Sequence, residues 1–421
     1  MVARRSAPTT STPVGSPRRR WSIPFCIWFP LAIFAATRLV NFIMISLAAR
    51  HQVALYQTIP GYYVNTPTPA SPSYLSVVTN WDGQWYERIA THGYGEPSAL
   101  SYGDAIAEGH AWAFPPLFPL AAAGVMELTG VGFGAAATVV NLIAGAAAMV
   151  MIFLLLERTA GRFVASALVA MTCAFISAPL LQLAYSESLA LAFLSAALLL
   201  IQRRRYGFAM IAVTALALTR LITPPLAVVI VAHSWSRYRR RAEAPVRRTK
   251  ILGMLGVGLL SLGGLLLWSF IATSWLSASE GTDANRGSVS GLAGMSLGWF
   301  GALYRAQGLA GTGLLLVAVL VLVRLAYDSR ANNWGTEIRA WYWAYPTFIL
   351  AGSGVHAGIL RYLLLAFPLL LTVVGSPGRE TIPRLRLALV VVLCCVGLGL
   401  QWFWIDHALI MHQARITPWM P

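Results

Sequence analysis

The sequence predicts an all-α polytopic membrane protein with about 11 transmembrane helices and a large first extracytoplasmic loop. Of its 421 residues, 57% are hydrophobic and only 11% are charged, with a mean hydropathy of +0.65. A soluble domain is about one quarter charged. Apolar runs of bilayer-crossing length recur along the chain, and Lys and Arg cluster between them, as the positive-inside rule describes.

The basic character of the chain indicates a lipid bilayer as partner rather than nucleic acid. The formal net charge is +16, but the arginines occur in short groups between apolar runs and not in one polar domain. The four cysteines all lie within apolar runs, which favours small buried side chains over disulfides. No Cys or His spacing is of the zinc type, so the sequence predicts no zinc site.

The first 130 residues divide into a tail, a span and a loop. Residues 1–20 are rich in Ser, Thr, Pro and Arg, which predicts a disordered cytoplasmic tail. The apolar run 21–49 is too long for a signal-peptide core and predicts the first span. Residues 50–130 form the first external loop. Three prolines within 113–120 argue against a regular helix there, and a short surface helix to about Thr129 follows.

The predicted membrane domain comprises residues 21–405. After the first external loop, its sequence predicts further apolar spans separated by short polar segments. We expect them near 131–156, 163–179, 186–202, 206–221, 222–236, 251–276, 309–325, 339–355, 359–375 and 387–405. With this count the N-terminus is cytoplasmic and the tail 406–421 is extracytoplasmic. Of 31 Lys and Arg residues, 23 fall in the proposed inside segments and seven in the outside segments, which supports a multi-pass protein of the plasma membrane.

The polar stretch 80–94 stands out between the apolar runs. As an amphipathic helix it would carry Trp81, Trp85 and Ile89 on one face, because they are spaced at i, i+4 and i+8. Trp is common at membrane surfaces, so we expect this face to lie there and to present Asp82 just above the bilayer. Asp82 is our candidate catalytic base. The alternative is that its side chain only caps the helix.

Other polar residues near span ends fall on the same predicted side as Asp82. We interpret Arg361, His356 and Arg220 as cations for a donor phosphate, because a charged group at the membrane boundary is costly unless it is paired or functional. The candidates for substrate binding are Trp81, Gln84, Trp85, Tyr86, Glu87, Tyr185, Glu187 and Tyr362. The alternatives are arginines that snorkel to lipid headgroups, and a Tyr185–Glu187 segment that braces a span.

These residue types suit the transfer of a sugar from a polyprenyl monophosphate. Asp82 would take the proton of an acceptor hydroxyl as that oxygen attacks the anomeric carbon, through an oxocarbenium-like transition state. The cations would neutralise the leaving phosphate, and a single displacement would invert the anomeric centre. Asp82 is followed by Gly83 and Gln84, not by an Asp-x-Asp pair, so the sequence requires no divalent cofactor, although it leaves one open.

Five segments, in order along the chain, resemble motifs of the PIG-V mannosyltransferases of phosphatidylinositol-glycan assembly. They are Trp81–Tyr86 with Ile89–Ala90 and Gly93–Tyr94, Ala113–Leu120, Tyr185–Glu187, Thr219–Arg220, and Arg361–Tyr362 with Phe367–Pro368. The chain departs from the family in one place, because the proline after Arg220 is displaced to Pro224.

This resemblance implies a GT-C fold with a catalytic acid in the first external loop, which matches Asp82. It also implies a polyprenyl-phosphate-mannose donor. The Arg-rich, Lys-poor composition looks like that of an actinobacterium, whose relatives of this type mannosylate envelope glycolipids and lipoglycans. Two alternatives stay open: another donor sugar, such as arabinofuranose or glucose, and a lipid-linked sugar flippase or transporter. A transporter needs polar residues near mid-membrane, whereas the candidates here gather at one face.

Overall fold

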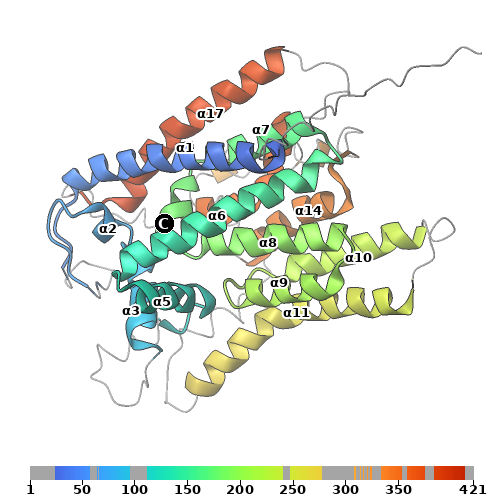
Figure 1. The fold of residues 1–421 in the computed structure, drawn as a ribbon, viewed down its shortest axis with the longest axis horizontal. Helices are drawn as coiled ribbons and strands as arrows, with labels where there is room; N and C mark the ends of the chain where they lie inside the picture. The colour runs from blue at the N-terminus through green and yellow to red at the C-terminus, as the bar shows by residue number, and fades with distance from the viewer. Residues whose placement is uncertain are drawn as a thin grey trace, which may run out of the picture.

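The computed structural model describes residues 24–56, 64, 66–94, 111–239, 247–276, 333–352, 358–374 and 384–412, and single positions between 308 and 324. Within these ranges the regular elements are helices, and the one extended pairing is an isolated bridge between Leu55 and Thr68. Figure 1 shows the helices as a bundle along one long axis. The predicted tail 1–20, His356, residues 413–421 and most of the predicted span 309–325 lie outside the described residues.

Four helices in the described part are long and apolar enough to cross a membrane, which confirms the predicted class of all-α membrane protein. They are α1 (Phe25–Ala48), α6 (Phe133–Glu157), α11 (Arg248–Leu276) and α17 (Arg384–Trp404). The shorter helices of the bundle are α7 (Arg162–Cys173), α8 (Glu187–Gln202), α9 (Tyr206–Ala217), α10 (Pro224–Arg239) and α14 (Thr336–Gly352). The number of transmembrane crossings stays a prediction.

Two of the expected spans are broken rather than continuous. In 163–179, α7 ends at Cys173 and a 3-10 helix, η3 (Ala178–Gln182), follows. In 359–375, α15 (Ile359–Leu365) gives way to the 3-10 helix η6 (Phe367–Leu370) and then to α16 (Leu371–Val374). A proline occupies the first turn of both 3-10 helices, where its missing N–H does no harm but prevents the preceding helix from continuing.

The Pro-rich segment before the second span is more helical than its sequence suggests. Helix α5 (Leu117–Thr129) begins inside this segment and contains Pro119. The prediction of irregular chain over 113–120 was therefore wrong for its last four residues. Proline is tolerated in a first turn because the N–H groups there have no partner within the helix.

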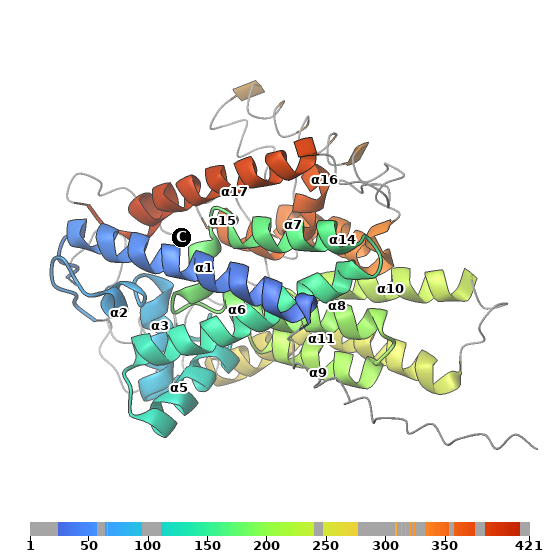
Figure 2. The same ribbon diagram turned by 45° about the horizontal axis from the view of Figure 1, so that its top comes forward.

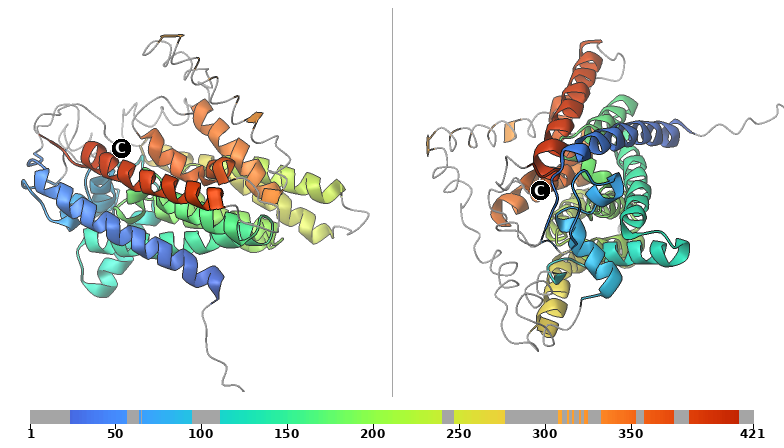
Figure 3. Two further views of the ribbon diagram at one scale, coloured as in Figure 1. Left: turned by 90° about the horizontal axis from the view of Figure 1, so that it is seen from above. Right: turned by 90° about the vertical axis from the view of Figure 1, so that its left-hand side faces the viewer.

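Helix α8 lies at the centre of the bundle, packed between α6 and α9. Most of its side chains are buried, including Glu187 at its first position. Small residues allow close packing around it. A Cβ on Gly145 of α6 would lie 2.6 Å from the ring of Phe34 on α1 and 3.4 Å from Ser188 Oγ on α8, so a larger residue would force the Phe34 ring to move. The end-on view in Figure 3 shows the other helices around this core.

The bundle has two distinct ends. Helix α3 (Asp82–His92) and α5 lie together at one end, at the left in Figure 1, and α10 extends at the other end. Figure 2 shows the same separation after rotation. Helix α8 links the two ends, because its first residue lies near α3 and its last precedes Arg203–Arg205. A 16-residue helix is about 24 Å long.

Candidate active site

The polar stretch forms a helix, and a strained residue sets where it begins. Helix α3 starts at Asp82, and its N-cap Trp81 has φ 59° and ψ −118°. A non-glycine residue in this region costs about 1–3 kcal/mol and persists only where other contacts hold it. Here the indole N–H of Trp81 donates to the Leu409 carbonyl at 2.9 Å, and the Asn80 amide donates to the same oxygen at 3.2 Å.

The tryptophan face of α3 does not lie at a membrane surface. Trp81, Trp85 and Ile89 share one face as predicted, but they are only 5%, 5% and 3% exposed. The prediction of a surface location was wrong because the face covers the interior of the protein. The hydrogen bond to Leu409 also satisfies the Trp81 indole there, as buried indoles require.

Asp82 is held by an arginine from the far end of the sequence. Arg361 Nη1 donates to Asp82 Oδ2 at 2.6 Å, and Arg361 Nε donates to Glu187 Oε1 at 2.8 Å. Arg220 Nη1 donates to the same Glu187 oxygen at 2.7 Å. These four side chains are called the charge cluster below. Asp82 therefore binds an arginine, and the N-cap position of α3 belongs to Trp81 rather than to Asp82.

The charge cluster is balanced and mostly buried. It pairs two carboxylates with two guanidinium groups, and the exposed fractions of the side chains are 0% for Glu187, 8% for Arg361, 11% for Arg220 and 29% for Asp82. Such groups are stable inside a protein only when each charge has its partner. The arginines are therefore not anchors that snorkel to headgroups. Asp82 is the most accessible member of the cluster.

Hydroxyl groups extend the cluster toward α3. Tyr86 donates to Ser186 Oγ at 2.9 Å, and Arg220 Nη1 donates to the same hydroxyl at 3.3 Å. The Tyr185 hydroxyl donates to the Asn80 carbonyl at 3.1 Å. Burial raises the pKa of the Tyr86 phenol, so this group stays protonated and remains a hydrogen-bond donor.

Each arginine of the cluster also lies over an aromatic ring. The Arg361 guanidinium carbon is 4.7 Å from the ring centroid of Tyr185, and that of Arg220 is 5.2 Å from the ring of Tyr362. Both distances fall within the range of cation–π attraction. The predicted substrate-binding residues Tyr185 and Tyr362 thus contact the arginines and fix their planes.

A close backbone approach explains the glycine after Asp82. A Cβ on Gly83 would lie 3.2 Å from the Val78 carbonyl oxygen and 3.4 Å from the Ala184 Cβ. The Ala184 N–H also donates to the Val78 carbonyl at 2.9 Å. The first turn of α3 therefore packs directly on the segment that leads into α8, and this contact brings Asp82 near Glu187.

Gln84 and Glu87 line a separate cavity of about 270 Å³, whose lining does not include Asp82. Thr68 and Gly134 form part of the same wall. Glu87 is half-buried, and this burial raises the pKa of its carboxyl above the ordinary value of 4.5. The structure therefore places these two predicted substrate contacts on another side of α3 from the charge cluster.

Two features near the charge cluster had not been singled out from the sequence. Ser186 joins Tyr86 to Arg220, and it lies within the Tyr185–Glu187 motif, so the motif could have indicated it. The Tyr345 hydroxyl is buried and has no hydrogen-bond partner within the described ranges. It lies inside the apolar α14, where its sequence gave no signal.

The described residues contain no group of three or more His, Cys, Asp or Glu side chains that could hold a metal ion. His356, which the sequence predicts as a third cation for the donor phosphate, lies outside these residues. The roles of Arg361 and Arg220 toward a phosphate, and the independence from metal, therefore stay predictions. The structure shows that Arg361 and Arg220 form hydrogen bonds with Asp82 and Glu187.

Comparison with known proteins gives distant structural likenesses. No family model matches the chain, and no curated protein matches it in sequence. The chain is similar to the archaeal oligosaccharyltransferase AglB from Archaeoglobus fulgidus, solved with an inhibitory peptide and a dolichol-phosphate, with a TM-score of 0.47 and 12% identity. It is also similar to ArnT from Cupriavidus metallidurans, solved with undecaprenyl phosphate, with a TM-score of 0.46 and 14% identity.

These two matches cover most of the present chain but less of the other proteins. They span 91% of this chain and 56% of AglB, and 90% of this chain and 72% of ArnT. Likenesses of this size carry no conclusion about activity. The class that the structure defines is an all-α membrane protein with a buried charge cluster at one end.

Proposed function

We propose that this chain is an integral membrane glycosyltransferase of the GT-C type. It transfers mannose from polyprenyl-phosphate-mannose to an envelope glycolipid or lipoglycan at the extracytoplasmic face, with inversion. One observation carries the proposal: Asp82, the most accessible carboxylate of the charge cluster, is oriented by Arg361 at 2.6 Å. The order of the sequence motifs supports the superfamily and the donor.

In this mechanism Asp82 accepts the proton of the acceptor hydroxyl. The acceptor oxygen forms its bond to the anomeric carbon while the bond from that carbon to the phosphate oxygen breaks. The bonding electron pair leaves with the phosphate. The reaction thus turns a polyprenyl phosphodiester into a monoester, which gains negative charge and needs a cation beside it.

The contact between Asp82 and Arg361 links these two events. While Asp82 is ionised, it accepts a hydrogen bond from Arg361 Nη1. Once Asp82 has taken the acceptor proton, it loses its negative charge and its attraction for the guanidinium weakens. Arg361 can then turn its hydrogen bond toward the leaving phosphate, so proton transfer and stabilisation of the leaving group reinforce each other.

Glu187 keeps the two arginines in place for this exchange. It is fully buried and accepts from both Arg361 and Arg220 through one oxygen, at 2.8 and 2.7 Å. Without it, two like charges would lie side by side with less compensation. We therefore assign Glu187 as a positioning residue, not a contact to the substrate.

The test is sugar transfer by the purified chain in lipid, with radiolabelled polyprenyl-phosphate-mannose and an envelope glycolipid extract. Asp82→Asn keeps the shape of the side chain but cannot act as a base, so we expect transfer to fall by about 100-fold or more. The matched control is Glu127→Gln, because Glu127 is an exposed acid on α5 at the same end. It should transfer at the wild-type rate.

Three results would separate the alternatives. Unchanged transfer by a folded Asp82→Asn protein would overturn the assignment of the base. Transfer from polyprenyl-phosphate arabinofuranose or glucose, and not from the mannose donor, would correct the sugar and keep the reaction type. Movement of lipid-linked sugar across vesicles with no transfer would identify a transporter.

A further inference from the structure

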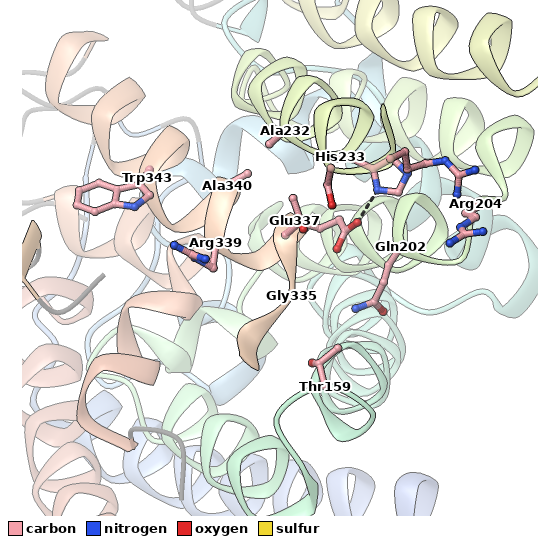
Figure 4. A pocket seen from close by; sticks show the side chains of 13 residues that line it. Thr159, Gln202, Arg204, Ala232, His233, Gly335, Glu337, Arg339, Ala340 and Trp343 are labelled. Carbon is pink, nitrogen blue, oxygen red and sulfur yellow. Dashed lines mark hydrogen bonds and ion pairs between the residues drawn. The ribbon is translucent and has the colours of Figure 1, made fainter. Parts of the chain in front are cut away.

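A second polar site lies at the end of the bundle opposite the charge cluster. It is a cavity of about 500 Å³ bounded by the ends of α8 and α10 and by the start of α14. Figure 4 shows Arg204, Gln202, His233, Glu337 and Arg339 around it. The length of α8, about 24 Å, separates Gln202 in its lining from Glu187 in the charge cluster. The cavity is therefore independent of the proposed catalytic site.

The cavity carries an excess of positive charge. Arg204, Arg237 and Arg339 line it, whereas Glu337 is the one carboxylate among its described lining residues. Within the described part of the chain, Arg204 and Arg237 form no ion pair with an acid. The Arg237 Nε is also buried, with no hydrogen-bond partner among these residues. A buried guanidinium N–H without an acceptor is costly and indicates a site that an anion completes.

The carboxylate of Glu337 does not balance these arginines, because it is already engaged. Glu337 Oε1 lies 2.5 Å from His233 Nδ1, and His233 Nε2 lies 2.9 Å from the Tyr206 hydroxyl. Figure 4 shows the contact between His233 and Glu337 as a dashed line. These hydrogen bonds occupy Glu337 and leave the guanidinium groups of Arg204 and Arg237 for another partner.

Exposed aromatic residues on α10 indicate that the cavity lies at the level of a membrane surface. Trp235 and Tyr238 are exposed and stacked, with ring centroids 6.1 Å apart, and the Arg239 guanidinium carbon lies 5.2 Å from the Trp235 ring. Exposed Trp and Tyr beside arginine are typical of the boundary between hydrocarbon and headgroups. Arg237, which lines the cavity, lies between these two aromatic residues in the sequence.

We propose that this arginine-lined cavity is a phosphate-binding site that takes the headgroup of an anionic lipid. Guanidinium groups bind phosphate oxygens through paired, charge-assisted hydrogen bonds, and arginine is the residue best suited to this geometry. A free phosphate shares this chemistry, so the experiment must distinguish the two sources. The site does not depend on the function proposed for Asp82.

The test uses the purified full-length chain in a neutral detergent. Bound molecules are counted by native mass spectrometry during titration with short-chain phosphatidylglycerol, with phosphatidylcholine and with inorganic phosphate. The matched variants are Ala232→Asp and Ala232→Asn, because Ala232 lines the cavity and the two new side chains differ by one charge. A second variant, Arg237→Gln, removes the cation itself.

We expect saturable binding of phosphatidylglycerol, and we expect Ala232→Asp to weaken it by roughly tenfold or more relative to Ala232→Asn. Arg237→Gln should weaken it similarly. Arg162→Gln serves as a control, because Arg162 pairs with Glu157 on the surface and does not line the cavity.

The outcomes decide both the site and its ligand. Saturable binding of inorganic phosphate with the same response to the variants would keep the phosphate site and assign it to a soluble ligand. Equal lipid binding by Ala232→Asp, Ala232→Asn and Arg237→Gln, with each protein eluting as a monodisperse peak, would overturn the proposal. Absence of saturable binding by the wild type would overturn it as well.

Discussion

The arginines near the two ends of α8 differ in how they are paired with carboxylates. At its start, the two arginines of the charge cluster are matched by two carboxylates, and Glu187 accepts from both arginines through one oxygen. At its end, the arginines of the cavity outnumber their single carboxylate, which is held by His233. A balanced cluster must exchange partners before it can bind an anion, whereas an unbalanced cavity can bind one directly. The first arrangement suits a reaction and the second suits steady binding.

The largest expected difference between the ends concerns their buried acids. Glu187→Gln leaves two buried guanidinium groups without their charged partner and should cost about 3–5 kcal/mol of stability. Glu337→Gln should cost about 1–3 kcal/mol, because its partner His233 can be neutral. Thermal unfolding in detergent measures both, with Glu157→Gln as the surface control at about 1 kcal/mol or less. A cost for Glu337→Gln as large as that for Glu187→Gln would show that the balance of charge does not distinguish the two ends.

The next largest effect concerns how tightly α3 is packed at the end that holds the charge cluster. Gly83→Ala places a Cβ 3.2 Å from the Val78 carbonyl and should cost about 1–3 kcal/mol, with a loss of transfer as Asp82 moves. Gly124→Ala is the matched helical control on α5, where a Cβ meets nothing within 4 Å. It should stabilise the protein by about 0.5–1 kcal/mol. A neutral Gly83→Ala would mean that the close approach of α3 does not position Asp82.

The smallest expected effect is a pH dependence at Glu87. Burial raises the pKa of this carboxyl above 4.5, so the folded protein holds the proton to higher pH than the unfolded chain. The free energy of unfolding therefore decreases as the pH rises from 4.5 through the raised pKa of Glu87. Glu87→Gln removes the loss, so the variant should melt at a higher temperature than the wild type at neutral pH and at the same temperature below pH 4.5. A difference in melting temperature between the wild type and Glu87→Gln that stays constant across all pH values would contradict this account.

Much of the architecture follows from the sequence because it depends on local patterns. Tyr206–Ala217 and Phe133–Glu157 lie close to the predicted spans 206–221 and 131–156, since apolar runs and their charged ends are visible in the chain. The sequence also named the four members of the charge cluster as candidates. Their positions at span ends could be deduced once the alternation of spans was assumed.

The pairing inside the cluster could not be deduced. Glu187 and Arg361 are separated by 174 residues, and nothing in the sequence says which carboxylate meets which guanidinium. The burial of Trp81 was missed for a similar reason, since its partner Leu409 lies 328 residues further along the chain. Amphipathic spacing identifies a face of a helix, but the material that covers this face depends on the rest of the fold.

The Leu409 carbonyl has a consequence for how the protein is made. It accepts hydrogen bonds from both Asn80 and Trp81, the residues immediately before Asp82, and the Val53 N–H donates to the nearby Met411 carbonyl. These contacts come from the last described turn of the chain, η7 (Ile405–Leu409), and the residues after it. During synthesis, Leu409 leaves the ribosome 328 residues after Trp81. The start of α3 therefore gains these two hydrogen bonds only after the helices between Trp81 and Leu409 have been made.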